Sequence, residues 1–391
     1  MIKQTKFEES PITVLTEDII LNILHRLPLK SLGKCKVVSK SWHSLISNPE
    51  FAKFHLQLCT DPPLTIALQY YNTFSRLENS SDITNNGAEL IPLEYQFPAT
   101  FFKTHFCFLI GSCDGLVCIY FKMKSVMVTK QVFKDMMFLW NPMTNERKEI
   151  TLPKEPGHTY VKFKLCWFGS VPSIDDYKIV LVYIAYNYPS ERRFVVYSFK
   201  DRTWRQMHDT LGDELIFGPS INLVFKNEAL HCLVSHETIC KFDLVRETFE
   251  VFPLSIPGFS QGSHSKMLGV LGEDRSLYVM FSQSPVNWLW EVWLQKEHNK
   301  WDSWRRLYNT SMELSEEFVL YCSKFLGFTY GGILCVQLMN ELWLIDPTLD
   351  PPLYAVVKNP SYAKVFEVFD YVESLISPVS VLPQVNQSKV R

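Results

Sequence analysis

One stretch of the sequence has the spacing of a catalytic serine. Residues 258–262 read GFSQG, which matches the G-x-S-x-G pattern. In that pattern a strained turn from a strand into a helix lifts the serine hydroxyl toward a histidine. Here Pro253 and Pro257 precede Ser260, and no apolar helical pattern follows it. The sequence therefore favours a loop between strands over a serine hydrolase site, and we expect no catalytic residue.

A second stretch, residues 228–243, contains two histidines and two cysteines, which are side chains that zinc accepts as ligands. Successive side chains on a strand point to opposite faces, so His231 and Cys232 diverge, and His236 and Cys240 cannot complete both faces. Because too few ligands share one face, we expect no metal. The sequence also lacks a G-x-x-x-x-G-K-[ST] loop and a strand-linked G-x-G-x-x-G loop, so we expect no cofactor.

A third stretch, residues 183–194, places aromatic and arginine side chains at an expected hairpin tip. Tyr186, Tyr188, Arg192 and Arg193 have the composition of the residues that dominate binding energy at protein interfaces. We treat them as candidate substrate-binding residues. An ordinary charged turn is the commoner explanation of such a stretch, because most exposed residues contribute little to binding.

The whole chain has the composition of a protein with a large folded core. Its 391 residues exceed the usual size of one domain, and hydrophobic residues make up 47% of them. Aromatic residues reach 14%, which favours strands. The formal net charge of −2 provides no basic field for nucleic acid or an anionic membrane, so we expect neither as a partner. The first eleven residues lack the apolar segment of a secretory signal, which predicts the cytoplasm, the nucleus or both.

Two periodicities divide the chain into a small helical domain and a large β domain. Apolar residues recur at helical spacing between Ile19 and Ile46, and the period changes to two after a short Pro-containing stretch. We expect helices over about 16–27, 31–38 and 40–47. The expected boundaries are 10–58 for the helical domain, 59–63 for a linker, 64–383 for the β domain and 384–391 for a tail.

The β domain repeats a unit of about fifty residues that contains several strands. The central aromatic residues of five units are 45 to 57 residues apart, namely Trp140, Tyr197, Phe242, Trp293 and Trp343. One such sheet cannot bury both of its faces, so neighbouring units must stack around an axis as propeller blades. A sixth unit would pair residues 64–71 with residues 366–376 and close the ring. We therefore expect an α+β multidomain fold in which a helical domain precedes an all-β, six-bladed propeller; a β-sandwich or two smaller β domains is the alternative.

The helical domain has more apolar surface than it can bury alone, so it either docks on the β domain or presents the surplus to a partner helix. Its fixed spacings are Leu15-Thr16, Ile23-Leu24, Leu27-Pro28, Leu32 and Val38-Ser39-Lys40-Ser41-Trp42. These spacings resemble the F-box. The β domain resembles the plant F-box-associated domain of type 1, which is kelch-related, in the stretches GSCDGLVCI (111–119), LWNPMTNERKEITLP (139–153), DDYKIVLV (175–182), VYSFKDRTWRQM (196–207) and YVESLISP (371–378).

The resemblance implies a non-catalytic adaptor subunit. An F-box binds the Skp-type adaptor of an SCF ubiquitin ligase, and through it the cullin and the RING protein, while the associated domain binds the protein substrate that is ubiquitinated and degraded. By position, the resemblance implies that Trp42 packs the F-box core and that seven residues contribute to the Skp interface: Leu15, Ile20, Leu24, Leu27, Pro28, Leu32 and Val38. Two alternatives stay open, a Skp-bound scaffold whose partner is not degraded and a hydrolase that uses Ser260.

Three features depart from the family pattern. Thr16 stands where a proline is usual, and Gly33 stands where an apolar residue is usual in the second helix. Glycine in a helix costs about 1 kcal/mol relative to alanine. Kelch repeats carry a glycine pair in each blade, whereas this sequence contains only Gly331-Gly332. The expected propeller is therefore of a degenerate kelch type.

Overall fold

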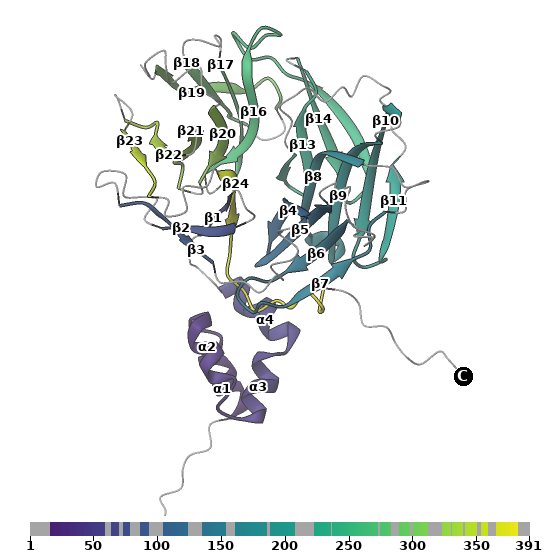
Figure 1. The fold of residues 1–391 in the computed structure, drawn as a ribbon, viewed down its shortest axis with the longest axis vertical. Helices are drawn as coiled ribbons and strands as arrows, with labels where there is room; N and C mark the ends of the chain where they lie inside the picture. The colour runs from purple at the N-terminus through teal and green to yellow at the C-terminus, as the bar shows by residue number, and fades with distance from the viewer. Residues whose placement is uncertain are drawn as a thin grey trace, which may run out of the picture.

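The structure is a computed structural model, and it places four α-helices at one end of a ring of β-sheets (Figure 1). None of the helices within its described residues has the length and apolar character needed to span a membrane. The described residues are 16–58, 64–69, 73–78, 87–93, 105–123, 135–153, 161–185, 188–207, 223–235, 237–272, 274–282, 289–297, 300–311, 323–329, 331–338, 341–349, 353–358 and 365–381.

The helical domain contains the three expected helices and a fourth that the sequence did not predict. The Ser39 hydroxyl accepts a hydrogen bond from the backbone amide of Trp42 at 3.1 Å and caps the third helix. The Asn48 side chain accepts one from the amide of Glu50 at 2.9 Å, with Pro49 as the first helical residue. Asn48-Pro49 thus ends one helix and begins the next. The helices are α1 (Glu17–Leu24), α2 (Leu29–Cys35), α3 (Lys40–Ile46) and α4 (Pro49–Leu58).

The described strands form six four-stranded antiparallel sheets, each of which is one blade of the propeller. One end strand of each blade is the innermost, and five of the six neighbouring pairs of these inner strands contact each other around the axis: β24 with β4, β4 with β8, β12 with β16, β16 with β20, and β20 with β24. From the axis outward, the blades are β24 (Val365–Tyr371), β1 (Leu64–Gln69), β2 (Thr73–Glu78), β3 (Glu89–Pro92); β4 (His105–Cys113), β5 (Leu116–Met123), β6 (Met136–Trp140), β7 (Arg147–Ile150); β8 (Val161–Val171), β9 (Asp176–Ala185), β10 (Tyr188–Ser198), β11 (Thr203–Met207); β12 (Val224–Lys226), β13 (Ala229–Leu233), β14 (Thr238–Asp243), β15 (Thr248–Pro253); β16 (His264–Leu271), β17 (Ser276–Ser282), β18 (Leu289–Gln295), β19 (Trp304–Ser311); β20 (Ser323–Phe328), β21 (Leu334–Leu338), β22 (Glu341–Asp346), β23 (Leu353–Val356).

The repeat predicted from the sequence corresponds to the outer three strands of each blade. All five predicted central aromatic residues lie on the third strand of a blade, on β6, β10, β14, β18 and β22. Apart from β24, the innermost strands were not part of the predicted repeat. On β4, a Cβ atom at Gly111 would lie 2.9 Å from the backbone nitrogen and oxygen of Phe168 on β8. Neighbouring inner strands therefore approach so closely that a side chain is excluded at this position.

The ring is closed by the two ends of the β domain, as the sequence predicted. Strand β24 pairs with β1 in antiparallel register, with Ile66 opposite Phe369 and Thr65 opposite Asp370. One blade thus takes its inner strand from the end of the chain and its outer strands from the start. This arrangement holds the first and last strands of the β domain together.

The helical domain is joined to the propeller through α4 and through residues 372–381, which we call the strap. Ala52 of α4 is buried in the same hydrophobic cluster as residues of the β4–β7 and β8–β11 blades. Leu375 of the strap packs against both this cluster and the core of the helical domain. Figure 1 shows α4 beside the strap at the base of the ring. The helices therefore share a continuous core with the propeller.

A buried asparagine holds the strap in place. The Asn141 side chain is fully buried, and its Nδ2 donates hydrogen bonds to the carbonyls of Ser374 at 3.0 Å and Ile376 at 2.8 Å. Its Oδ1 accepts hydrogen bonds from the amides of Met143 and Thr144 at 2.8 and 3.1 Å. One side chain thus fastens the strap to the turn that follows β6.

An ionic cluster connects the β8–β11 blade to the β12–β15 blade. The Lys178 ammonium is buried and donates hydrogen bonds to the Leu244 carbonyl and, at 2.8 Å, to the Glu247 carboxylate. Arg205 also donates to Glu247 and pairs with Asp201. Burial acts to raise the pKa of Glu247, but the hydrogen bonds from Arg205 and Lys178 outweigh it and hold that pKa below its ordinary value.

Candidate functional site

The helical domain has exposed apolar side chains on α1 and between α2 and α3, which we together call the helix surface. Ile19 and Ile23 lie one turn apart on α1 and are 46% and 47% exposed, whereas Val37 and Val38, between α2 and α3, are 85% and 65% exposed. Several exposed apolar side chains on one small domain are typical of a surface that binds another protein. The helix surface therefore has the character of an interface with another protein.

The residues predicted to bind a Skp adaptor divide between this surface and the core beneath it. Leu24 and Leu32 are fully buried, so in this conformation they support the surface and do not face a partner. Ile20 and Leu27 are half-buried and Pro28 and Val38 are exposed, while Leu15 lies outside the described residues. Half-buried Trp42 packs against the core of the domain. The sequence assignment missed Ile19, Ile23 and Val37, although the i, i+4 spacing on α1 was a usable signal.

Two histidines fasten the end of α1 to α4. The His55 Nε2 forms a hydrogen bond of 2.9 Å with the Leu27 carbonyl, and the His25 ring stacks on Phe51 at 4.3 Å between centroids. Burial lowers the pKa of His25, and nearby His55 lowers it further. These contacts fix the position of the Leu27-Pro28 corner relative to α4.

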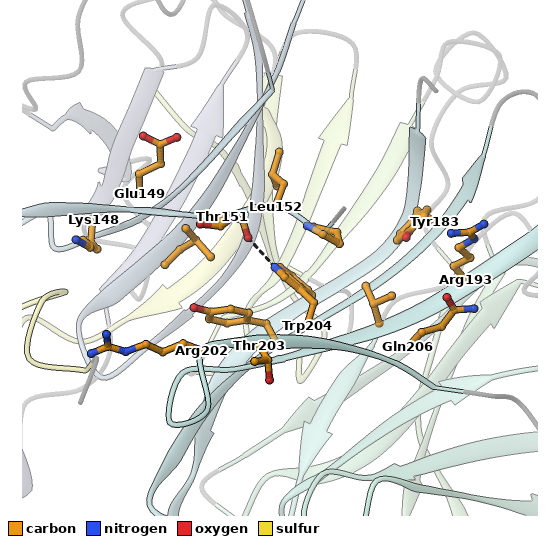
Figure 2. Close-up of a pocket in the computed structure, with 14 residues that line it drawn as sticks. Lys148, Glu149, Thr151, Leu152, Tyr183, Arg193, Arg202, Thr203, Trp204 and Gln206 are labelled. Atoms are coloured by element: carbon orange, nitrogen blue, oxygen red, sulfur yellow. Dashed lines mark hydrogen bonds between the residues drawn. The ribbon is translucent and has the colours of Figure 1, made fainter. Parts of the chain in front are cut away.

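A second candidate site is a pocket between the β4–β7 and β8–β11 blades, which we call the inter-blade pocket. It has a volume of about 660 Å³ and lies between two outermost strands, β7 and β11. Its wall is formed by Tyr183, Tyr197 and Trp204 together with aliphatic side chains. The Trp204 indole donates a hydrogen bond of 2.6 Å to the Thr151 carbonyl, which bridges the two blades (Figure 2).

The rim of the inter-blade pocket is predominantly basic. Lys148, Arg193 and Arg202 line it, with Glu149 as the acidic residue among its lining side chains. In Figure 2, Trp204 lies between Arg202 and Lys148 on one side and Arg193 on the other. Burial raises the pKa of Tyr197, against the opposing effect of the positive charge on Arg202. The pocket thus combines aromatic rings with a surplus of positive charge.

Of the four residues predicted at the hairpin tip, one lines this pocket. Arg193 lines the pocket beside Tyr183. Tyr188 and Arg192 belong to β10 and pair with Ala185 and Ile184 of β9 by their backbones. Tyr186 lies outside the described residues. The sequence assignment did not include Trp204, for which the available signal was an aromatic residue among the polar residues of TWRQM (203–207).

The stretches that resembled catalytic and metal sites have other structures. Strand β15 ends at Pro253 and the next element is strand β16 from His264, so exposed Ser260 lies in a turn that leads into a strand and not into a helix. Cys232 and Cys240 lie directly opposite each other on β13 and β14 in a small hydrophobic cluster, whereas His231 lies near Trp301 at 5.6 Å between ring centroids. Within the described part of the chain, no three metal-binding side chains converge.

Comparison with known proteins agrees with this architecture. Residues 12–54 match the F-box domain, and residues 70–378 match the F-box associated beta propeller domain. F-box protein CPR1 of Arabidopsis thaliana is 25% identical over 342 residues, which cover 78% of this chain and 75% of that protein. An F-box/kelch-repeat protein of the same plant is 25% identical over 312 residues, covering 74% of this chain and 78% of that protein.

Likeness to solved structures is low. TolB from Acinetobacter baumannii aligns with 80% of this chain and 64% of its own length, at a TM-score of 0.40 and 10% identity. The match to the propeller domain, by contrast, extends over more than half of the chain and includes every described strand except β1. Four helices with an F-box match precede this propeller, so the chain belongs to the family of F-box proteins with an F-box associated beta propeller domain.

Proposed function

We propose that this protein is a substrate-recognition subunit of an SCF ubiquitin ligase. The helix surface binds a Skp-type adaptor, which connects the chain to the cullin and the RING protein. The propeller binds a second protein, here called the client, which is ubiquitinated and then degraded. The protein itself supplies no catalytic group. It acts by holding the client at high effective concentration near a ubiquitin-charged enzyme, in the cytoplasm, the nucleus or both.

The exposed helix surface is the observation that carries this proposal. Leu24, Leu32 and Ile46 fill the domain core, while Ile19, Ile23, Val37 and Val38 stay exposed next to it. Burying one such side chain contributes about 1.5–3 kcal/mol. Covering the surface with adaptor helices would therefore stabilise the complex by several kcal/mol.

Adaptor binding is tested with the Ile23→Ser/Val38→Ser double variant of the full chain. Loss of two buried apolar contacts should weaken adaptor binding by about 3–5 kcal/mol, which is at least a hundredfold in Kd. Isothermal titration calorimetry with a purified plant Skp adaptor measures the effect. Both positions are exposed, so the variant should unfold at the same urea concentration as the original chain.

The matched control is Val245→Ser/Val251→Ser, which removes two similarly exposed valines from the propeller, 40% and 43% exposed. It should bind the adaptor normally. Equal affinity of the two double variants would contradict the assignment of the helix surface. Leu27→Ala/Pro28→Ala is a weaker choice, because half-buried Leu27 also belongs to the hydrogen-bonded corner.

The ligase role is tested in cells with the proteasome blocked. Affinity purification of the original chain should recover the adaptor and ubiquitinated client, whereas Ile23→Ser/Val38→Ser should recover client without adaptor and without ubiquitin. These substitutions are preferable to deletion of the helical domain, since α4 shares a core with the propeller. A client whose abundance and ubiquitination are the same with both proteins would refute the degradative role.

A further inference from the structure

We propose that the inter-blade pocket binds a short acidic peptide segment of the client, with one aromatic or long apolar side chain of that segment against Trp204. This inference rests on the proposed function, because it assigns the client-binding site of the same receptor. It places that site on the outer wall of the ring, between β7 and β11.

The charge of the pocket determines the charge of the ligand. Its lining includes three cationic side chains, Lys148, Arg193 and Arg202, against one carboxylate, Glu149. Among the described residues, Lys148 and Arg202 are exposed and have no ion pair. The chain as a whole has a net charge of −2, so this positive surplus is local. A ligand that carries carboxylates matches it, and a basic ligand does not.

The aromatic wall of the pocket determines which side chain of the ligand packs against Trp204. Half-buried Trp204 stands against Tyr197, with ring centroids 5.0 Å apart, and its indole nitrogen is engaged by the Thr151 carbonyl. The ring is therefore held in place before any ligand arrives. Val195 and Leu152 extend the apolar wall beside it. Rigid tryptophan with neighbouring arginine is the composition that dominates binding energy at interfaces.

The position of the pocket suits a peptide chain. β7 and β11 are the outermost strands of their blades, so each has an edge that is not paired within its sheet. Such edges offer backbone donors and acceptors to an extended segment. The volume of about 660 Å³ is in the range of pockets that enclose a small ligand, which corresponds to a few side chains of a peptide.

The pocket is also coupled to the helical domain. Trp204 and Leu152 pack against the hydrophobic cluster that contains Ala52 of α4, and the strap residues Leu375 and Ile376 belong to or pack against the same cluster. A client segment bound in the pocket would therefore be held at a fixed position relative to the helix surface. A ligase receptor needs this property to present client lysines reproducibly.

The experiment selects peptides from a displayed library of random twelve-residue sequences against the purified full chain bound to its adaptor. Selected peptides should be rich in Asp and Glu around an aromatic or long apolar residue. Fluorescence polarisation with labelled peptides then compares the original chain with Lys148→Glu/Arg202→Glu, which should bind at least tenfold more weakly. Both positions are exposed, so the substitutions should leave the folded structure intact.

The control variant is Arg246→Glu/Arg275→Glu, which produces the same change in net charge at exposed turns outside the pocket. Arg275 also matches Arg202 in its left-handed backbone, with φ of 49° and 58°. The control should bind the peptides as the original chain does. Failure to select any peptide, selection of peptides without acidic residues, equal loss in both variants, or displacement of the peptide by an oligothymidylate would each overturn the inference.

Failure of this inference is distinguishable from failure of the proposed function. If the client is still ubiquitinated by the Lys148→Glu/Arg202→Glu variant at the original rate, the receptor role stands and the pocket assignment is wrong. If the peptides bind and the variant loses them, but the client is never ubiquitinated, the pocket assignment stands and the ligase role is wrong.

Discussion

Replacement of Asn141 by alanine should detach the strap from the propeller. The Asn141 side chain makes four hydrogen bonds, two to strap carbonyls and two to backbone amides of its own turn. Alanine leaves all four partners without a bond. Because Leu375 and Ile376 are held against α4 and the propeller by this arrangement, we expect the junction between the two domains to loosen.

The magnitude follows from the number of partners that lose a bond. A buried polar group left unpaired costs about 1–3 kcal/mol. Four groups give an upper limit near 12 kcal/mol, but a released strap and turn expose most of them to water, so we expect a loss of about 3–5 kcal/mol. Asn141→Asp should lower the free energy of unfolding by at least as much. The aspartate would still accept hydrogen bonds from the amides of Met143 and Thr144, but it would place a carboxylate oxygen, which cannot donate, against the carbonyls of Ser374 and Ile376.

Urea unfolding followed by tryptophan fluorescence measures this loss, and hydrogen exchange of residues 372–381 locates it. The control is Asn22→Ala, which removes one exposed hydrogen bond to the Asp18 carbonyl on α1 and should change stability by less than about 0.5 kcal/mol. An Asn141→Ala protein that loses less than about 1 kcal/mol and whose strap exchanges at the original rate would show that Asn141 does not hold the strap.

Three further substitutions test other parts of the structure. The pKa of Glu247 is held below its ordinary value, so its contribution to stability is present above about pH 4.5 and is lost as the pH falls through the folded pKa. Glu247→Gln should therefore lower the urea midpoint at pH 7 but make it less sensitive to pH between 5 and 3, and identical pH profiles would contradict this. Gly33→Ala should raise the free energy of unfolding by up to about 1 kcal/mol, because a Cβ there meets no atom within 4 Å; a loss in thermal denaturation would contradict it. Gly111→Ala should lower the free energy by about 1–3 kcal/mol in the same assay, because its Cβ would meet the Phe168 backbone at 2.9 Å, and an unchanged Tm would show that β4 and β8 can separate without cost.

The repeat predicted from the sequence consisted of the outer strands of the blades, and of the inner strands it included only β24, which closes the ring. Aromatic residues such as Trp140 and Trp343 recur on the third strands, where flat side chains pack between blades. Their spacing revealed the repeat of about fifty residues. The inner strands pack at the crowded axis, where a glycine such as Gly111 replaces a side chain. Close packing of this kind breaks the regular pattern of apolar residues, so the inner strands gave no comparable signal.

The sites could be predicted in part for a similar reason. The F-box spacings located the helical domain, but they did not separate Leu24 and Leu32, which form its core, from Ile19, Ile23 and Val37, which lie on its surface. That division depends on α4, whose Phe51 fills the core of the helical domain and which was not predicted from the sequence. The inter-blade pocket combines residues that are about fifty positions apart, such as Lys148 and Arg202, and only the register of neighbouring blades brings them together.

Ring closure by β24 has a consequence for how the protein is made. A ribosome completes α1–α4 and the β1–β3 strands roughly three hundred codons before it completes β24 and the strap. A premature stop codon in that interval yields a polypeptide whose helix surface is present, whose β1 edge is uncovered and whose propeller is open. Under the proposed function, such a fragment would bind the adaptor without delivering a client, so we expect truncating alleles to interfere with the intact copy and not merely to lack its activity.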